Sequence, residues 1–173
     1  MQALAYWKAV TTDKVGFLDH LIALLAGSGL RYCVIGGQAV NAFVEPVVSL
    51  DLDLAVATAD LESAEDLLRK HFRVERFPHS VNVSQPGSDL RVQLQTDPRY
   101  SAFVAAASEQ DVLGLRLPVA RLEDVLQGKV WAAQDAARRP SKRQKDLADI
   151  SRLLEAHPSL RSRVPDDLLS RLI

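Results

Sequence analysis

Two aspartates one residue apart are the most promising chemical feature of this chain. Asp51 and Asp53 lie in the segment SLDLDLAV, where leucines alternate with them. Side chains on a β-strand alternate between faces with a rise of about 3.3 Å per residue, so both carboxylates should point the same way, about 6 to 7 Å apart. Like charges on one face repel each other, and aspartate is a poor strand former. A divalent cation between them would relieve the repulsion, because Mg²⁺ typically binds one or two carboxylates together with substrate phosphates.

The same alternation has a second interpretation. An exposed edge strand often carries charged side chains, which limit pairing with other molecules. The strand by itself does not decide between a cation site and a solvated edge.

A pair of glycines precedes this strand. Gly36 and Gly37 follow the apolar run Tyr32–Ile35 and come before the helix-compatible segment Gln38–Phe43. Glycine permits a tight turn and a close approach of the backbone to a ligand. The first amides of the following helix would then be available to phosphate oxygens. An isolated Gly-Gly pair is usually a plain strand-to-helix turn, and only its combination with the two aspartates favours a phosphate site.

The order of strand, Gly-Gly turn, short helix and Asp-x-Asp strand resembles the DNA polymerase β-like nucleotidyltransferase superfamily. Within it, the chain is similar to the AbiEii/AbiGii-type toxin nucleotidyltransferases, over about residues 21–154. The resemblance implies an α/β (α+β) nucleotidyltransferase fold, with a small mixed β-sheet flanked by helices and a helical C-terminal part.

The resemblance also implies roles for the residues already named. Gly36 and Gly37 would hold the triphosphate of an NTP substrate, and Asp51 and Asp53 would hold Mg²⁺ or Mn²⁺. Ser49 matches a hydroxyl residue often found two positions before the first aspartate, where it would bond the turn or a phosphate.

Lys129, in DVLQGKVWAA, matches a lysine in the helix that follows the last strand of related proteins. An ammonium group is a compact point charge suited to phosphate, so the resemblance implies a triphosphate contact. A solvated helix lysine is the alternative.

The run RQKDLADI matches the start of a helix typical of the AbiEii-type group. Arg143 and Lys145 would contact phosphate of a nucleotide or an RNA. Asp146 and Asp149 lie one helical turn apart and could pair with Arg143, Lys145 or Arg152, so we expect their role to be mainly structural.

Two positions depart from the family pattern. Active members carry a third carboxylate on a later strand, and Gln93 in LRVQLQ (90–95) corresponds to it. An amide can accept a hydrogen bond but cannot act as a base. Asp89 and Asp97, at the ends of that strand, do not occupy the motif position. Related chains also often carry an arginine where this chain has Val47.

Hydrophobic periodicity and turn residues predict the remaining elements. We expect a single domain over 1–173, with a core of about 13–120 and a helical part of about 121–173. Tyr6 and Trp7 suggest that the N-terminal segment packs against the core. The predicted helices cover 13–26, 60–71, 100–107, 121–137, 142–155 and a short segment after Pro165. The other predicted strands cover 73–77, 80–84, 90–95 and 112–117.

Composition limits the classes of protein. The chain has 173 residues, of which 47% are hydrophobic and 25% charged, and a formal net charge of -1. This is typical of a globular domain, and nucleic-acid binding would need a local patch such as the basic run at 138–145. The single cysteine, Cys33, should be buried. No apolar run has the length of a membrane span, and no signal-like segment opens the chain, so we expect a cytoplasmic protein without a membrane partner.

Two functions use the pair of aspartates, and a structural or partner-binding domain with no small ligand is a third possibility. The first is transfer of a nucleoside monophosphate from an NTP to a hydroxyl of RNA, such as a tRNA, or of a protein. The resemblance implies that such an enzyme is the toxin of a toxin-antitoxin or phage-defence pair, with a cognate antitoxin as partner. The second is a catalytically degenerate module that binds a nucleotide or a protein partner, which Gln93 and Val47 favour.

Overall fold

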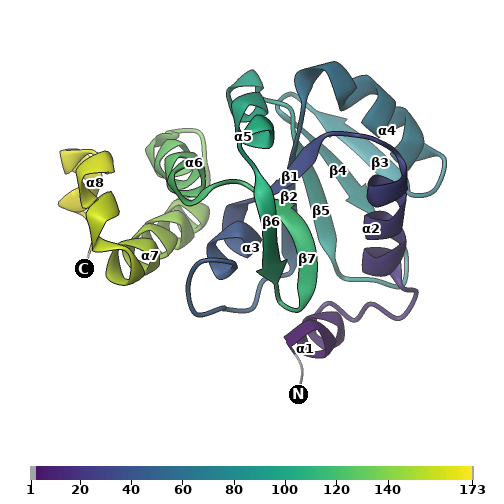
Figure 1. The fold of residues 1–173 in the computed structure, drawn as a ribbon, viewed down its shortest axis with the longest axis horizontal. Helices are drawn as coiled ribbons and strands as arrows, with labels where there is room; N and C mark the ends of the chain where they lie inside the picture. The colour runs from purple at the N-terminus through teal and green to yellow at the C-terminus, as the bar shows by residue number, and fades with distance from the viewer. Residues whose placement is uncertain (1–2, 173) are drawn as a thin grey trace.

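The computed structural model describes residues 3–172, which form one mixed β-sheet with helices on both faces (Figure 1). Its strands lie in the order β3-β4-β5-β2-β1-β7-β6. β2 pairs antiparallel with β1 and parallel with β5, so it is a central strand and the edge-strand interpretation of the two aspartates is wrong. The strands are β1 (Tyr32–Ile35), β2 (Asp51–Val56), β3 (Arg73–Phe77), β4 (Ser80–Ser84), β5 (Arg91–Gln95), β6 (Ser108–Val112) and β7 (Leu115–Val119).

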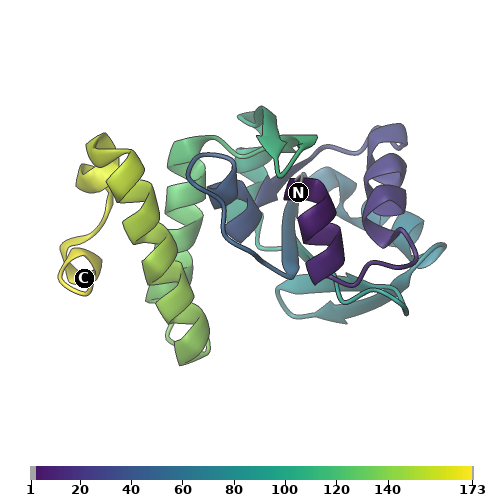
Figure 2. The ribbon, with the colours of Figure 1, turned by 90° about the horizontal axis from the view of Figure 1, so that it is seen from below.

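The helices divide between the two faces of the sheet. Helices α2 and α4 lie on one side, whereas α3, α6 and α7 lie on the other (Figures 1 and 2). This arrangement confirms the predicted fold class of a mixed sheet flanked by helices. The α-helices are α1 (Ala3–Val10), α2 (Phe17–Gly27), α3 (Gly36–Asn41), α4 (Leu61–Arg69), α5 (Ser101–Ala105), α6 (Leu122–Gln134), α7 (Pro140–Ala156) and α8 (Asp166–Leu169). Short 3₁₀ turns cover Thr58–Asp60, Pro98–Tyr100 and Pro158–Arg163.

Side-chain alternation explains why β2 forms at the centre. Leu52 and Leu54 are fully buried, whereas Asp51 and Asp53 on the opposite face remain partly exposed. The neighbouring β5 repeats the pattern, with Val92 buried on the same side as the leucines. One face of this half of the sheet is therefore apolar and covered, and the other is polar.

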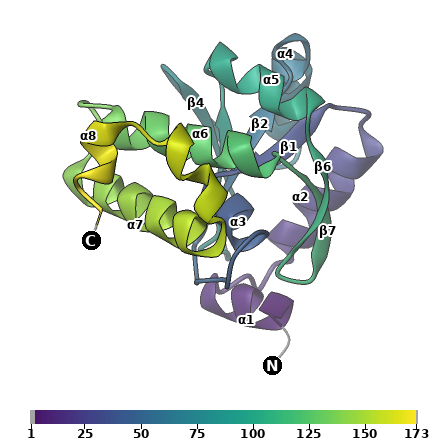
Figure 3. The ribbon, with the colours of Figure 1, turned by 60° about the vertical axis from the view of Figure 1, so that its left-hand side comes forward.

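The C-terminal helices α6 and α7 pack side by side and close one end of the molecule (Figure 3). Pro140 begins α7, where its fixed φ suits the first helical position and its missing N–H has no intrahelical partner to lose. Helix α3 contacts both α6 and α7. It covers Gly36–Asn41, so both glycines belong to the helix, and the predicted turn before a helical segment Gln38–Phe43 is wrong.

One predicted strand is wrong. Instead of a single strand over 112–117, β6 and β7 form a hairpin. Leu113 and Gly114 make its two-residue turn, with φ of 53° and 93°. A two-residue hairpin turn that matches the normal strand twist requires positive φ at both residues. Such turns usually contain Asn-Gly or Asp-Gly, so the pair Leu-Gly did not indicate one in the sequence. Asp111 supports the turn, because its Oδ1 accepts a hydrogen bond from the Gly114 amide at 3.0 Å.

The N-terminal segment packs against the core through one of its two aromatic residues. Trp7 of α1 is 2% exposed, whereas Tyr6 is 47% exposed. The next helix begins at Phe17 rather than at residue 13, because the Asp13 carboxylate accepts hydrogen bonds from the amides of Phe17 and Leu18 at 2.8 and 3.0 Å. Residues 1 and 2 of the predicted segment lie outside the described residues.

Cys33 is buried in β1, as expected, and burial raises the pKa of its thiol to about 12. Within residues 3–172, none of the helices combines the length and the apolar character needed to span a bilayer.

Candidate functional site

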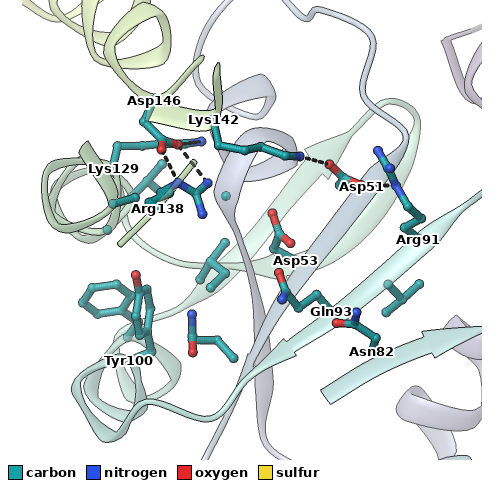
Figure 4. Close-up of a pocket in the computed structure, with 18 of the residues that line it drawn as sticks. Asp51, Asp53, Asn82, Arg91, Gln93, Tyr100, Lys129, Arg138, Lys142 and Asp146 are labelled. Atoms are coloured by element: carbon teal, nitrogen blue, oxygen red, sulfur yellow. Dashed lines mark hydrogen bonds and ion pairs between the residues drawn. The ribbon is translucent and has the colours of Figure 1, made fainter. Parts of the chain in front are cut away.

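Asp51 and Asp53 face a pocket of about 480 Å³ between the polar face of the sheet and helices α6 and α7 (Figure 4). Gly36 lines the same pocket at the start of α3. Three elements distant in sequence thus meet here, namely the start of α3, the central strand and the C-terminal helices.

Gly36 allows the backbone to approach Asp53. Its φ is +69°, and a Cβ at this position would overlap Oδ2 of Asp53. Gly37 is under no such restriction, because the nearest atom to a Cβ there would be the Ser49 Oγ at 4.0 Å. The first glycine is therefore required by both backbone conformation and space, and the second by neither.

Two cationic side chains bind Asp51 from opposite sides. The Nε of Arg91, on β5, lies 2.7 Å from Oδ1, and the Nζ of Lys142, on α7, lies 3.3 Å from Oδ2. Figure 4 shows the two contacts as dashed lines. These ion pairs reduce the repulsion that two aspartates on one strand face would otherwise cause.

In contrast to Asp51, Asp53 forms no ion pair with a lysine or arginine among residues 3–172. Burial is the main cause that raises the pKa of its carboxyl to about 6, and the negative charge of Asp51 adds to the shift. The positive charges of Lys129, Arg138 and Lys142 offset only part of it. Without a bound cation, the charged form of Asp53 is thus less favourable than in an ordinary aspartate. A cation beside the carboxylate would favour the charged form.

A row of polar side chains leads away from Asp53 across the sheet. In the strand register, Asp53 pairs with Gln93, Gln93 with Asn82, and Asn82 with Glu75. Directly paired residues share a face, so the four side chains form one line on the polar side. Gln93 therefore stands next to Asp53, where the resemblance implies a third carboxylate.

Lys129 is buried rather than solvated, which excludes one of its two interpretations. Its side chain is 10% exposed, and its Nζ lies 3.1 Å from Oδ1 of Asp146 and 2.8 Å from Oδ2 of Asp149. Burial lowers its pKa, but the two carboxylates outweigh burial and the net shift is upward. Lys129 lines the pocket as a permanently charged side chain, and its contact with a triphosphate stays a prediction.

Within the basic run at 138–145, the residues that reach the pocket are not the two expected to contact phosphate. Arg138 and Lys142 line it, whereas Arg143 and Lys145 do not. Lys145 is exposed, so a contact with an RNA outside the pocket stays a prediction for it. The signal available in the sequence was Pro140, which as the first residue of a helix places 138–142 at the end nearest the carboxylates.

Of the three partners expected for Asp146 and Asp149, only Arg152 pairs with either. Its Nη1 lies 2.7 Å from Oδ1 of Asp149. Asp146 instead binds Arg138, whose Nε lies 2.6 Å from Oδ2. Among the ion pairs within residues 3–172, none joins Arg143 or Lys145 to these aspartates, so those two alternatives are wrong and the one with Arg152 is confirmed.

Ser49 has the positional role expected of it. Its Oγ accepts a hydrogen bond from the Asp51 amide at 3.1 Å, and its carbonyl accepts one from Trp7 Nε1 at 2.9 Å. Val47, where relatives carry arginine, is 51% exposed, and Asn41 binds both its amide and its carbonyl. These contacts hold the loop that delivers Asp51.

Aromatic residues form a pocket wall that sequence analysis missed. Tyr100 and Phe103 line the pocket, with ring centroids 5.2 Å apart. Phe103 stacks on Trp131 at 5.6 Å, and Arg99 lies 4.5 Å above the Trp131 ring. Both pocket-lining aromatics are in a segment that the sequence indicates only as a short helix, so their direction could not be inferred.

The side chains fit a divalent cation that is shared with a substrate. Asp51 and Asp53 supply the oxygen ligands that Mg²⁺ prefers, and Gln93 adds an amide oxygen. Among residues 3–172 there is no group of three or more His, Cys, Asp and Glu that could hold a metal ion. Two carboxylates suffice where phosphates and water complete the coordination, so the donor set suits Mg²⁺ or Mn²⁺ bound with an NTP.

Comparison with solved structures shows which fold this is. Over 87% of this chain and 98% of the other, it matches ANT(2″)-Ia in complex with adenylyl-2″-tobramycin, with 15% sequence identity and a TM-score of 0.58. It also matches the lincomycin-bound lincosamide adenylyltransferase LnuA, with 11% identity and a TM-score of 0.54 over 79% of this chain and 95% of the other. The chain has the nucleotidyltransferase fold.

A third neighbour of this nucleotidyltransferase fold is an antigenic nucleotidyltransferase-like protein from Paracoccidioides brasiliensis. It has 18% identity and a TM-score of 0.50, over 96% of this chain and 93% of the other. No family model and no curated protein matches the sequence. At these identities the likeness establishes the fold, and the activity must be argued from the pocket.

Proposed function

We propose that this chain is a metal-dependent nucleotidyltransferase that transfers a nucleoside monophosphate from an NTP to a hydroxyl. The observation that carries the proposal is that Asp51 and Asp53, on the central strand, face the same pocket as Lys129, Arg138 and Lys142. Adjacent carboxylates and cations suit a metal-bound triphosphate, because the carboxylates hold the metal and the cations balance the phosphates.

In this proposal Asp51 and Asp53 hold Mg²⁺ or Mn²⁺. The bound cation would neutralise charge on the phosphates as the reaction proceeds. The amides that follow Gly36 and Gly37 would receive phosphate oxygens, and Gly36 keeps the start of α3 against Asp53. Tyr100 contributes an apolar wall to the same pocket.

The direction of attack follows from where the charges lie. The new bond forms between the acceptor oxygen and the α-phosphorus, while the bond to the pyrophosphate oxygen breaks on the opposite side. Pyrophosphate should leave toward the cations of α6 and α7. The acceptor would then approach over β5 and β4, past Gln93 and Asn82. Gln93 can accept a hydrogen bond from the attacking hydroxyl but cannot remove its proton, which would pass to solvent water.

The acceptor and the cellular role rest on the sequence resemblance. It supports an RNA such as a tRNA, or a protein hydroxyl, and a toxin paired with an antitoxin, acting in the cytoplasm where NTPs are available. The basic residues between Arg138 and Lys145 would contact RNA. ANT(2″)-Ia and LnuA, whose structures contain adenylyl-tobramycin and lincomycin, add small hydroxyl-bearing antibiotics to the acceptors worth testing.

The second candidate is a binding module without turnover. Gln93 favours it, because this side chain adjoins Asp53 and supplies no base. The ion pairs of Asp51 with Arg91 and Lys142 also stabilise the strand without a metal.

The test is transfer of label from each α-labelled NTP, with Mg²⁺ or Mn²⁺, to bulk tRNA, cell protein, tobramycin and lincomycin. The native chain is compared with Asp51→Asn/Asp53→Asn and with Asp66→Asn, a matched change on the exposed side of α4. We expect label with the native chain and Asp66→Asn only, and faster transfer with Gln93→Asp. A folded chain that binds metal and NTP but transfers nothing would support the binding module. One that binds no NTP would overturn the transferase and leave only a module that binds a protein partner.

A further inference from the structure

Lys142 differs from the other cations of the pocket in how loosely it is held. Its Nζ lies 3.3 Å from Asp51 Oδ2, longer than the usual 2.7–2.9 Å of a charge-assisted hydrogen bond. Its side chain is 37% exposed. It extends from the first turn of α7 into the pocket, toward the sheet (Figure 4).

The two other cations beside the pocket on the helical side, Lys129 and Arg138, are bound by carboxylates that a metal at Asp51 and Asp53 would leave in place. Lys129 binds Asp146 and Asp149, and Arg138 binds Asp146 at 2.6 Å. Among residues 3–172, the only carboxylate partner of Lys142 is Asp51. A divalent cation would therefore compete with Lys142 and leave Lys129 and Arg138 where they are.

We propose that Lys142 exchanges partners, binding Asp51 until a divalent cation takes that carboxylate and then binding a phosphate of the nucleoside triphosphate. This inference rests on the proposed function, because it assumes that the pocket takes a metal and a triphosphate. A displaced Lys142 remains attached to α7 beside the pocket, and its ammonium group is a compact cation suited to phosphate. Arg91 continues to hold the other oxygen of Asp51 from the sheet side.

The exchange of partners by Lys142 couples the binding of the metal to the binding of the nucleotide. Without nucleotide, Lys142 weakens metal binding because it occupies an oxygen that the metal needs. With triphosphate, the displaced lysine gains a new partner, so metal and nucleotide strengthen each other. Such coupling is reciprocal, since each ligand must change the affinity of the other by the same factor.

The variant Lys142→Gln separates competition with the metal from contact with the phosphate. Its affinity for the metal should rise, whereas its affinity for the triphosphate should fall. Lys145→Gln is the matched control, with the same loss of charge on the same helix but at an exposed position outside the pocket. The contact that stays proposed for Lys145 is with RNA, which is absent from both titrations. Any general effect of net charge appears in both variants.

Two titrations give the readout. Mn²⁺ binding without nucleotide should be up to about fivefold tighter in Lys142→Gln than in Lys145→Gln, as expected for loss of one partly exposed ion pair. Binding of the four α,β-methylene nucleoside triphosphates at saturating Mn²⁺ should be about tenfold weaker in Lys142→Gln than in the native chain, as expected for a lost hydrogen bond to a charged group. Neither titration depends on catalysis.

Each half of the proposal can fail by itself. Triphosphate binding equal to that of the native chain would exclude the phosphate contact, and Mn²⁺ binding no tighter than in Lys145→Gln would exclude the competition. If the native chain binds none of the four analogues at saturating Mn²⁺, the proposed function fails and the phosphate contact with it. The Mn²⁺ titration still decides whether Lys142 competes for Asp51.

Discussion

Among single residues, Gly36 and Asp53 depend most directly on each other. The backbone of one occupies the space into which the carboxylate of the other projects. Within the part of the chain that the structure describes, Asp53 also forms no ion pair, in contrast to Asp51 with its two. A change at Gly36 should therefore have an effect that the same change at Gly37 lacks, and a change at Asp53 one that the same change at Asp51 lacks.

Gly36→Ala should lower the free energy of unfolding by about 2 kcal/mol or more, because alanine is strained at positive φ and its Cβ would displace the Asp53 carboxylate. Gly37→Ala is the control and should change the free energy by less than about 1 kcal/mol. Urea denaturation of both variants measures the difference. Equal stability of the two would show that the backbone relaxes without cost.

The pKa of Asp53 predicts how stability depends on pH. In the folded chain this pKa is about 6, compared with 3.8 for an ordinary aspartate. The folded state therefore keeps a proton that the unfolded state has already lost, so unfolding free energy should fall as pH rises from about 4 to about 6. The loss is at most about 3 kcal/mol, from 1.36 kcal/mol per pKa unit.

The measurement compares the native chain with Asp53→Asn, which lacks this titration, across pH 4 to 7. The native chain should lose stability relative to the variant as pH rises, and Mg²⁺ should reduce that loss by favouring the charged carboxylate. Parallel pH profiles for the two chains would contradict the raised pKa.

At the scale of elements, the contact between α6 and α7 is built on a buried ion network. Lys129 comes from α6, and its partners Asp146 and Asp149 come from α7. Arg152 extends the network to α3, because its Nη2 donates to Asn41 Oδ1 at 3.1 Å. The helices that form one wall of the pocket are thus held to α3, the helix that begins with the two glycines.

Lys129→Met should destabilise the fold by about 3 kcal/mol, because it leaves two carboxylates short of a buried partner. Lys145→Met, on the exposed side of α7, should change stability by about 0.5 kcal/mol at most. Thermal or urea unfolding measures both. If Lys129→Met leaves the stability unchanged, Arg138 and Arg152 suffice to balance the charges of Asp146 and Asp149. The role of Lys129 would then be limited to contact with the substrate.

On the scale of the whole molecule, the described residues share one continuous apolar core. It extends from Trp7 of α1 to Leu168 of α8 and includes both leucines of β2. The predicted division into a core of about 13–120 and a helical part of about 121–173 therefore separates segments that bury each other. That the chain is a single domain stays a prediction.

Local pattern was enough to predict several elements and the fold class. The strands at 32–35, 73–77 and 80–84 have the predicted bounds, because alternation and turn residues act between near neighbours in sequence. The sequence alone did not indicate the hairpin at Leu113 and Gly114, since its turn uses an unusual residue pair.

For the candidate site too, some features could be predicted from the sequence and others could not. The sequence by itself determined that Asp51 and Asp53 share a strand face and that two glycines directly follow the preceding strand, because both follow from spacing within a few residues. Only the tertiary structure decided that β2 is central, that Gly36 adjoins Asp53, and that Lys142 crosses from α7 to Asp51. These contacts join residues up to 91 positions apart. They depend on how the helices pack on the sheet, which no local pattern in the chain records.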